Sequence, residues 1–154
     1  HAHGGFVIGS EFSGGMKNIV VRNNTFQGTD AGLRFKSAVK RGGKSENIYI
    51  DHIYMTDITG DAITFETTYF DNHVGAKQQA APVKQEFLPD FQDIHISNVY
   101  VRGCKNGIVA HGAEGMIHDI TIKDSNIFYN KNAKDIDAAC KITLENVNFS
   151  TFAK

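Results

Sequence analysis

A nine-residue pattern of apolar and polar positions occurs five times along the chain. Each copy has aliphatic residues at its second and fourth positions, a polar residue at its sixth position and an apolar residue at its ninth. The copies begin at residues 18, 47, 93, 119 and 141. Alternation with a period of two predicts a β-strand with one buried face, and the polar sixth position interrupts that phase. Each copy therefore predicts a strand, a polar corner and another strand.

The polar corner residue is Asn or Asp in all copies but one. The five corner residues are Asn23, His52, Asn98, Asp124 and Asn146. If the copies stack, their side chains form a ladder whose amides satisfy the backbone of buried turns. We expect His52 to share this structural role.

A further short strand follows the first three copies. It begins at Leu33, Ile63 and Ile108, each time after a turn that contains Gly or Asp. Residues 4–10 match the same strand of an earlier, truncated copy. Repeats of about 20 to 30 residues with two or three short strands are typical of a parallel β-helix, whose coils stack about 4.8 Å apart. We therefore expect an all-β fold, a single-stranded parallel β-helix.

The second and third copies start 46 residues apart, whereas the other spacings are 22 to 29 residues. The excess predicts a long loop insertion from about residue 67 to residue 91. Only Gly75–Glu86 has the composition of a helix, and Pro82 interrupts it. Long loops in compact domains tend to bind ligands or cover sites, so we expect this one to form a wall of a groove.

Composition and charge exclude several partners. A chain of 154 residues is long enough for one domain with its own core. A formal net charge of -1 predicts no nucleic-acid partner, and no apolar stretch reaches the length of a membrane span. Cys104 and Cys140 lack metal-site spacing and are expected as buried thiols without a disulfide. No metal or cofactor is expected.

Candidate chemistry lies on the strand that begins at Leu33. On a β-strand Arg34 and Lys36 point to one side, while Leu33 and Phe35 point to the other. Two adjacent cations repel each other, so this face favours an anion lying across it, although a solvated face with a chance Arg/Lys pair remains an alternative.

Stacking the coils adds two side chains to this face. His3 precedes the strand of the truncated copy, and Tyr69 follows the strand that begins at Ile63. An imidazole, two cations and a phenol suit a polyanionic sugar, because the cations pair with carboxylates and the phenol stacks on a sugar ring.

The run from His3 to Ser10, followed by Arg34-Phe35-Lys36, resembles the polygalacturonase family, family 28 of the glycoside hydrolases. The resemblance implies a right-handed parallel β-helix of the pectin lyase-like kind that hydrolyses galacturonan with inversion. It also implies that His3 supports the catalytic Asp residues and that Arg34, Lys36 and Tyr69 bind substrate. Ala2 stands where the family motif has Gly, and Gly5 is an extra residue.

The resemblance also points to a part of the family's machinery that this chain lacks. The family supplies its acid and base from an Asn-Thr-Asp and an Asp-Asp motif upstream of the His, and this chain begins at the His. Asp30 and Asp61 are expected in turns and Asp71 in the loop, with no pair beside Arg34. Residues 1–154 are therefore expected to be the C-terminal part of one β-helix domain, a partial set of coils that is inactive alone.

Two other functions remain open at this point. One is a polysaccharide lyase, which resembles this fold but uses an Arg base with Ca²⁺ and clustered Asp or Glu ligands. The other is a non-catalytic β-helix that binds uronates.

An incomplete β-helix exposes a strand edge. We therefore expect the N-terminal part of the same enzyme, or a second copy, to cover residues 1–15. The end from Phe149 to Lys154 likewise shows no amphipathic helix that would cover it. The resemblance implies a periplasmic or extracellular location.

Overall fold

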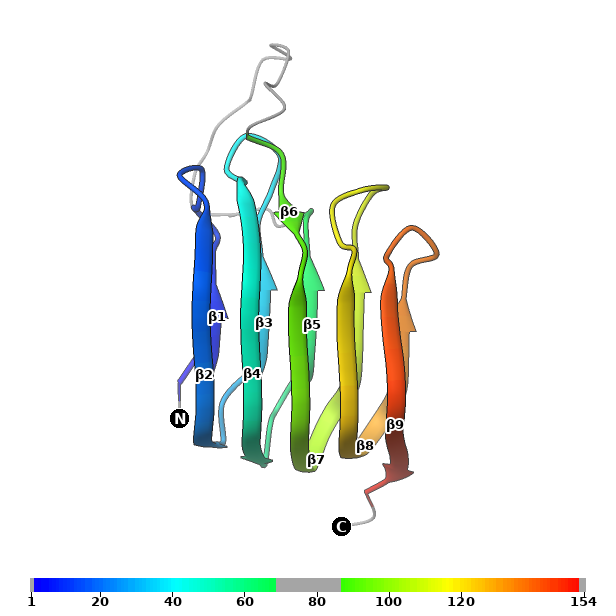
Figure 1. The fold of residues 1–154 in the computed structure, drawn as a ribbon. Coiled ribbons are helices and arrows are strands. Elements are labelled where there is room, and N and C mark those ends of the chain that lie inside the picture. Colours follow the sequence, from blue (N-terminus) through cyan, green and yellow to red (C-terminus); the bar gives the residue numbers. More distant parts are fainter. Residues whose placement is uncertain (1, 69–86, 153–154) are drawn as a thin grey trace.

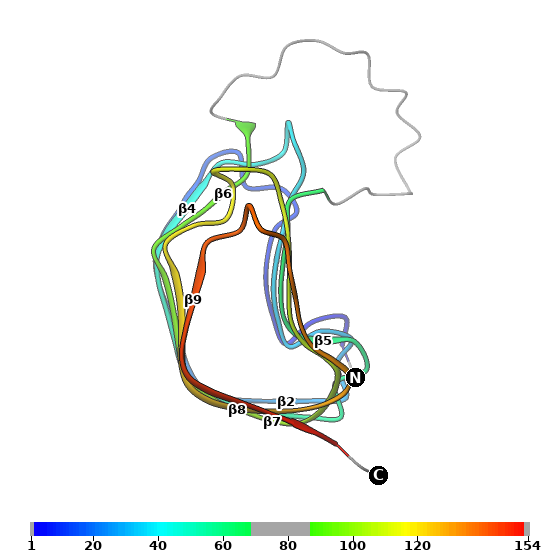
Figure 2. The same ribbon diagram turned by 90° about the vertical axis from the view of Figure 1, so that its right-hand side faces the viewer.

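The computed structural model describes residues 2–68 and 87–152, and within them the chain forms nine strands. The strands are β1 (Phe6–Ile8), β2 (Met16–Gln27), β3 (Leu33–Lys36), β4 (Lys44–Thr56), β5 (Asp61–Glu66), β6 (Asp90–Phe91), β7 (Ile94–His111), β8 (Ile120–Ile136) and β9 (Ile142–Thr151). Every pairing between named strands is parallel. The expected all-β parallel β-helix is confirmed, and Figures 1 and 2 show its right-handed coils from the side and along the axis.

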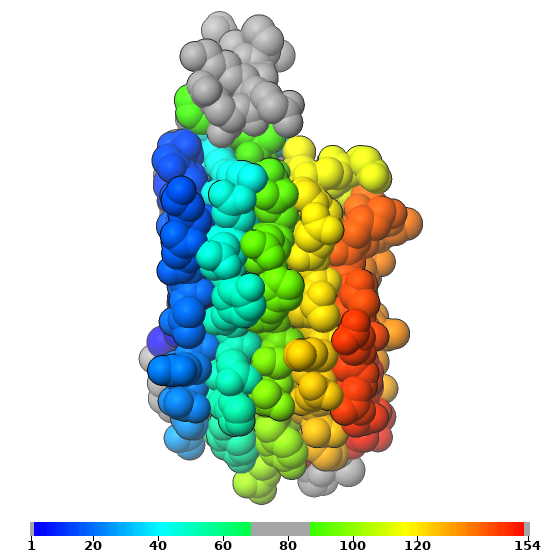
Figure 3. All heavy atoms as spheres, viewed as in Figure 1, coloured from blue at the N-terminus to red at the C-terminus, as the bar shows by residue number. Residues whose placement is uncertain are grey.

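Each coil has three sides, so the helix presents three parallel sheets (Figure 2). The first sheet contains β1, β3, β5, residues 106–111 of β7 and residues 132–136 of β8. The second sheet contains residues 19–22, 48–51, 94–97, 120–123 and 142–145, and the third contains residues 24–27, 53–56, 99–102, 125–129 and 147–151. In the space-filling view the coils stand against one another as adjacent columns (Figure 3).

The register of the sheets follows the sequence repeat. In the second sheet the second residues of the five copies pair in order, from Ile19 through Ile48 and Ile94 to Ile120 and Ile142. In the first sheet Leu33 pairs with Ile63, and Ile63 with Ile108. Phe6 pairs with Leu33, so residues 6–8 do form the same strand of a preceding coil.

The corner between the second and third sheets requires a left-handed backbone. All five predicted corner residues have φ between 49° and 57°. Asn and Asp tolerate this conformation better than most residues with a side chain. The expectation that these side chains satisfy buried turns is corrected, because all five are exposed. Asn146 donates to Asp124 at 2.8 Å, and His52 donates to its neighbour Asp51 at 2.7 Å.

Stacked inward side chains form the core. Phe35 and Phe65 are fully buried in adjacent coils, with their rings 4.5 Å apart and nearly parallel. Phe91 packs edge-on against both rings. Cys104 and Cys140 are buried free thiols, and burial raises the pKa of Cys104 to about 12. These thiols therefore fill space in the core, as expected.

The predicted insertion lies mostly outside the described residues. Its two ends belong to the coil, because Thr67 and Phe91 are buried and β6 pairs with β4. Inside residues 2–68 and 87–152, no helix combines the length and apolar character that a membrane span requires.

The left-handed corners generate a stability prediction at Asn23, whose φ is 57°. Replacing Asn23 with Ala should lower the free energy of unfolding by about 1 kcal/mol, because Ala is disfavoured in this backbone region. Replacing it with Gly should cost less, because Gly adopts positive φ freely. Equilibrium denaturation of both variants measures the difference, with exposed Thr25→Ala as the control. A larger loss for Gly than for Ala would contradict the prediction.

Candidate functional site

The outward face of the first sheet carries the predicted cations. Leu33 and Phe35 are fully buried, whereas Arg34 and Lys36 are half-buried on the opposite side of β3. The inward and outward phases of this strand are therefore those predicted. Because Arg34 and Lys36 are two residues apart, their side chains leave the same face of the sheet.

His3 lies in the coil before Arg34 and links two charged groups. Its Nδ1 lies 2.8 Å from Oδ2 of Asp30, and its Nε2 lies 2.7 Å from a guanidinium nitrogen of Arg34. His3 stands three residues before Phe6 and Asp30 three residues before Leu33, and those two residues pair. The strand register therefore places His3 beside Asp30.

This geometry determines the tautomer of His3. A guanidinium only donates, so Arg34 donates to Nε2 and Nε2 carries no proton. Nδ1 then carries the proton and donates it to the Asp30 carboxylate. In this tautomer His3 bridges the Arg34 guanidinium and the Asp30 carboxylate.

Asp30 accepts a second hydrogen bond from the next coil. The Thr59 hydroxyl donates to Oδ1 of Asp30 at 3.3 Å, while His3 donates to Oδ2. The hydrogen bond from His3, supported by Thr59 and by the positive charge of Arg34, lowers the pKa of Asp30 below its ordinary value. Protonating Asp30 therefore requires a lower pH than protonating an ordinary Asp side chain.

A cleft of about 160 Å³ opens beside Arg34 and spans two coils. Its lining includes Asp30 and Arg34 from one coil and Asp61, Thr64 and Glu66 from the next. Asp61 accepts a hydrogen bond from Asn106 at 2.8 Å. The cleft therefore presents one guanidinium among carboxylates, with Asp30 and Asp61 already bound by neighbouring side chains.

The structure brings together three of the four predicted site residues on one face: His3, Arg34 and Lys36. Tyr69 lies outside the described residues. Sequence reasoning placed Asp30 and Asp61 in turns. Asp30 lies at a bend between β2 and β3, whereas Asp61 is the first residue of β5. The contact between Asp30 and His3 was missed. The strand register predicted from the repeat contained that signal, because it makes His3 and Asp30 equivalent positions of successive coils.

Larger hollows lie away from these residues. One of about 790 Å³ is bordered by residues 13–15, 43–44, 88–90 and 114–116, and one of about 490 Å³ lies over the second sheet. Neither is lined by His3, Arg34 or Lys36. We place the candidate site at the cleft beside Arg34, because Arg34 lines it and is in direct contact with His3.

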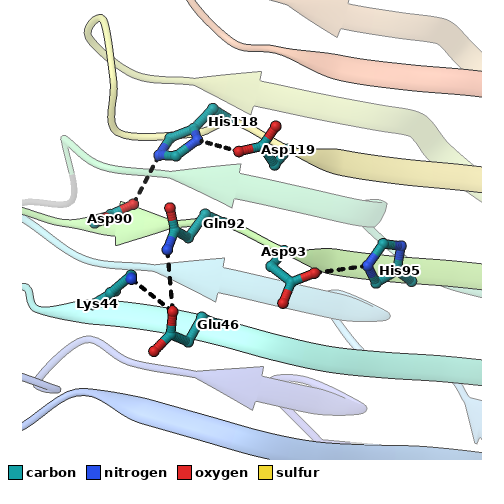
Figure 4. A network of polar contacts seen from close by, with 8 residues as sticks. All are labelled: Lys44, Glu46, Asp90, Gln92, Asp93, His95, His118 and Asp119. Carbon is teal, nitrogen blue, oxygen red and sulfur yellow. Dashed lines mark hydrogen bonds and ion pairs between the residues drawn. The ribbon is translucent and has the colours of Figure 1, made fainter.

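A second polar network lies where the chain enters the second sheet (Figure 4). His118 bridges Asp90 and Asp119 at 3.0 Å each, and Lys44 and Gln92 both donate to Glu46. These contacts join neighbouring coils and pair charges with one another. Among the described residues, no three His, Cys, Asp or Glu side chains are grouped so that they would hold a metal ion.

The chain is a parallel β-helix whose first sheet carries Arg34 and Lys36 on its outward face. The family model described as "Glycosyl hydrolases family 28" matches residues 2–143, so the chain belongs to glycoside hydrolase family 28. The resemblance seen in the sequence is thereby confirmed.

The chain is similar in sequence to curated proteins that are named as polygalacturonases or galacturonosidases. A polygalacturonase of Ralstonia nicotianae is 27% identical over 145 residues, which cover 88% of this chain and 25% of the relative. A polygalacturonase of Ralstonia solanacearum is 32% identical over 68% of this chain and 18% of the relative. An exo-poly-alpha-D-galacturonosidase of Dickeya chrysanthemi is 30% identical over 66% of this chain and 16% of the relative. This chain therefore spans a quarter or less of their lengths.

A solved structure has the same fold. A hyperthermoactive exopolygalacturonase from Thermotoga maritima superimposes with a TM-score of 0.80 and 32% sequence identity. The match covers 96% of this chain and 31% of that structure.

The contact between His3 and Asp30 generates a prediction about ionisation. Replacing His3 with Ala should raise the pKa of Asp30 towards its ordinary value, because the hydrogen bond from His3 is the largest cause of the lowering. Because the pKa of Asp30 is lowered in the folded state, ionised Asp30 stabilises the fold at pH values above its ordinary pKa. This contribution to the free energy of unfolding is lost as the pH falls through the lowered pKa. Carboxyl NMR titration measures the change, and Thr59→Ala serves as a control with a smaller expected rise. An unchanged pKa in His3→Ala would contradict the hydrogen bond.

Proposed function

We propose that this chain forms the uronate-binding part of a pectin-degrading glycoside hydrolase that cleaves galacturonan with inversion. The observation that carries the proposal is the chain of contacts from Asp30 through His3 to Arg34, beside Lys36 on one outward face. Family membership and the printed names of the polygalacturonase relatives support it.

The cations suit the carboxylates of a polyuronate. Arg34 donates one guanidinium hydrogen bond to His3, and a planar guanidinium has a shape that matches a carboxylate. Lys36 adds a second positive charge on the same face. Tyr69 is proposed as a further substrate contact, as the family resemblance implies. Binding of this kind holds the sugar chain in a fixed position relative to the reacting bond.

His3 acts as a positioning residue in this proposal. It holds Arg34 by accepting one guanidinium hydrogen bond, and its Nδ1 proton is used by Asp30. Inverting hydrolysis requires an acid and a base about 6.5–9.5 Å apart. We propose that upstream Asp residues of the enzyme, which His3 supports, supply this pair and that the present chain alone does not hydrolyse.

The remaining coils of the enzyme are the proposed partner, with a second copy as the alternative. Among the described residues β1 and β2 each pair on one side only, with β3 and β4. Ile19 and Val21 at this end are partly exposed, whereas the equivalent Ile48 and Ile50 are fully buried. Stacking of further coils would bury this surface. Because pectin lies outside the cell, we also propose a periplasmic or extracellular location.

A non-catalytic uronate-binding β-helix is the second candidate function. The hydrogen bonds of Asp30 and Asp61 in the cleft favour this non-catalytic function for the chain by itself. Asp30 is bound by His3 and Thr59, and Asp61 is bound by Asn106. Neither carboxylate is presented as one member of an acid and base pair.

Replacing Arg34 and Lys36 with Ala tests the proposed binding. The double variant should bind oligogalacturonate at least about tenfold more weakly, because contacts to charged groups each contribute about 1.5–3 kcal/mol. Isothermal titration calorimetry measures the affinity. The charge-matched control is Arg22→Ala with Lys123→Ala, two exposed cations of the second sheet.

An unchanged affinity for oligogalacturonate in the Arg34/Lys36 variant would contradict the proposed binding site. A reducing-end assay on the intact protein separates the two candidate functions. Hydrolysis of polygalacturonate supports the hydrolase, whereas binding without any release of reducing ends supports the non-catalytic alternative.

Mass spectrometry of the intact protein under native and denaturing conditions tests the proposed partner. We expect the native mass to exceed that of the 154-residue chain, because the exposed edge of β1 and β2 is covered by further coils or by a second copy. The denatured mass distinguishes these two arrangements. A native monomer of this chain alone would contradict the proposal.

A further inference from the structure

The outward rows of the first sheet change charge along the helix axis. One row runs in register through Val7, Arg34, Thr64, Val109 and Asp135. The neighbouring row runs from Lys36 through Glu66 to His111. Both rows therefore carry a cation in the coil of β3. A carboxylate follows in a later coil, at Asp135 in the first row and at Glu66 in the second.

Glu66 marks the start of the acidic region. It follows Lys36 directly in register, so one coil spacing of about 4.8 Å separates their backbones. It also lines the cleft beside Arg34. An anion that leaves Arg34 and Lys36 in this direction therefore meets a carboxylate within one coil.

His111 and two Asp residues continue the acidic region. Nδ1 of His111 lies 3.2 Å from Asp137, and Nε2 lies 3.5 Å from Asp135. Asp137 also accepts a hydrogen bond from the backbone N–H of Gly112. The two carboxylates are thus held at fixed positions around one imidazole.

The adjacent cation Lys134 does not reach these outward rows. It stands in register with Ile108, which points into the core. Its ammonium lies 5.7 Å from the centre of the Phe149 ring, over the end of the core. The acidic charge on the outward face is therefore not compensated by the lysine beside it in the sequence.

We infer that Glu66, Asp135 and Asp137 limit the uronate-binding surface, so that charged sugar units occupy the coil of Arg34 and are excluded from the coils that follow. This inference rests on the proposed function and specifies its substrate. A polyuronate extends from Arg34 towards the coil of β1, and any unit that lies over the later coils is uncharged.

Screening sets the range of this exclusion. Asp135 lies three coils from Arg34, about 14 Å along the axis, which exceeds a Debye length of about 8 Å at physiological salt. A unit bound at Arg34 is therefore almost unaffected by Asp135. A charged unit over the coil of Val109 lies within one Debye length of both Glu66 and Asp135, and it is repelled by both.

The test compares oligogalacturonates of two and eight units with the intact protein and a Glu66→Gln/Asp135→Asn variant. The variant should bind the longer oligomer about two- to fivefold more tightly than the wild type at low salt, which is the size of surface charge effects. Affinity for the dimer should change less, and the difference should vanish at high salt. The control is Glu145→Gln, which removes one exposed carboxylate of the last coil on the second sheet.

The outcomes separate this inference from the function on which it rests. A selective, salt-dependent gain for the longer oligomer supports the limit. If the wild type binds both oligomers and the affinity of the variant depends on oligomer length in the same way, the proposed charge limit is wrong. The proposed uronate-binding function then still stands. If the wild type binds neither oligomer, the proposed function fails and the limit fails with it. Asp137 is left unchanged, because it also holds the backbone of Gly112.

Discussion

The parallel hydrogen bonding between equivalent residues of successive coils is the constraint on which the structure depends. It places Ile48 beside Ile94 and Phe35 beside Phe65, so each inward position must suit a copy of itself about 4.8 Å away. Aliphatic side chains and flat rings meet this condition, because they pack closely on their own kind. A slip of one residue would turn each inward side chain to the surface.

The same register assembles the site from residues that are distant in sequence. His3 and Asp30 are 27 residues apart, yet they are successive members of one row. Arg34 then lies within reach of His3 because it is on the coil of Asp30. The two hydrogen bonds of the imidazole compensate part of the cost of fixing a cation and an anion close together. The Arg34 guanidinium donates to one ring nitrogen, and the other ring nitrogen donates to the Asp30 carboxylate.

The sequence allowed the coils and their register to be predicted, because the alternation of apolar residues is strong in every copy. The outward placement of Arg34 and Lys36 followed from the same alternation. The role of the corner residues was mistaken, since the pattern shows that Asn98 is polar but not that its backbone is left-handed and its side chain exposed. The contact between His3 and Asp30 was missed because Asp in a turn has an ordinary local explanation.

Inward and outward positions are subject to different constraints in this fold. Leu33, Ile63 and Ile108 must remain alike, because each packs on the next in the core. The outward neighbours Arg34, Thr64 and Val109 lie outside this stacked core and are in turn a cation, a polar residue and an apolar residue. A β-helix can therefore vary the charge of its outward face one coil at a time without disturbing its core.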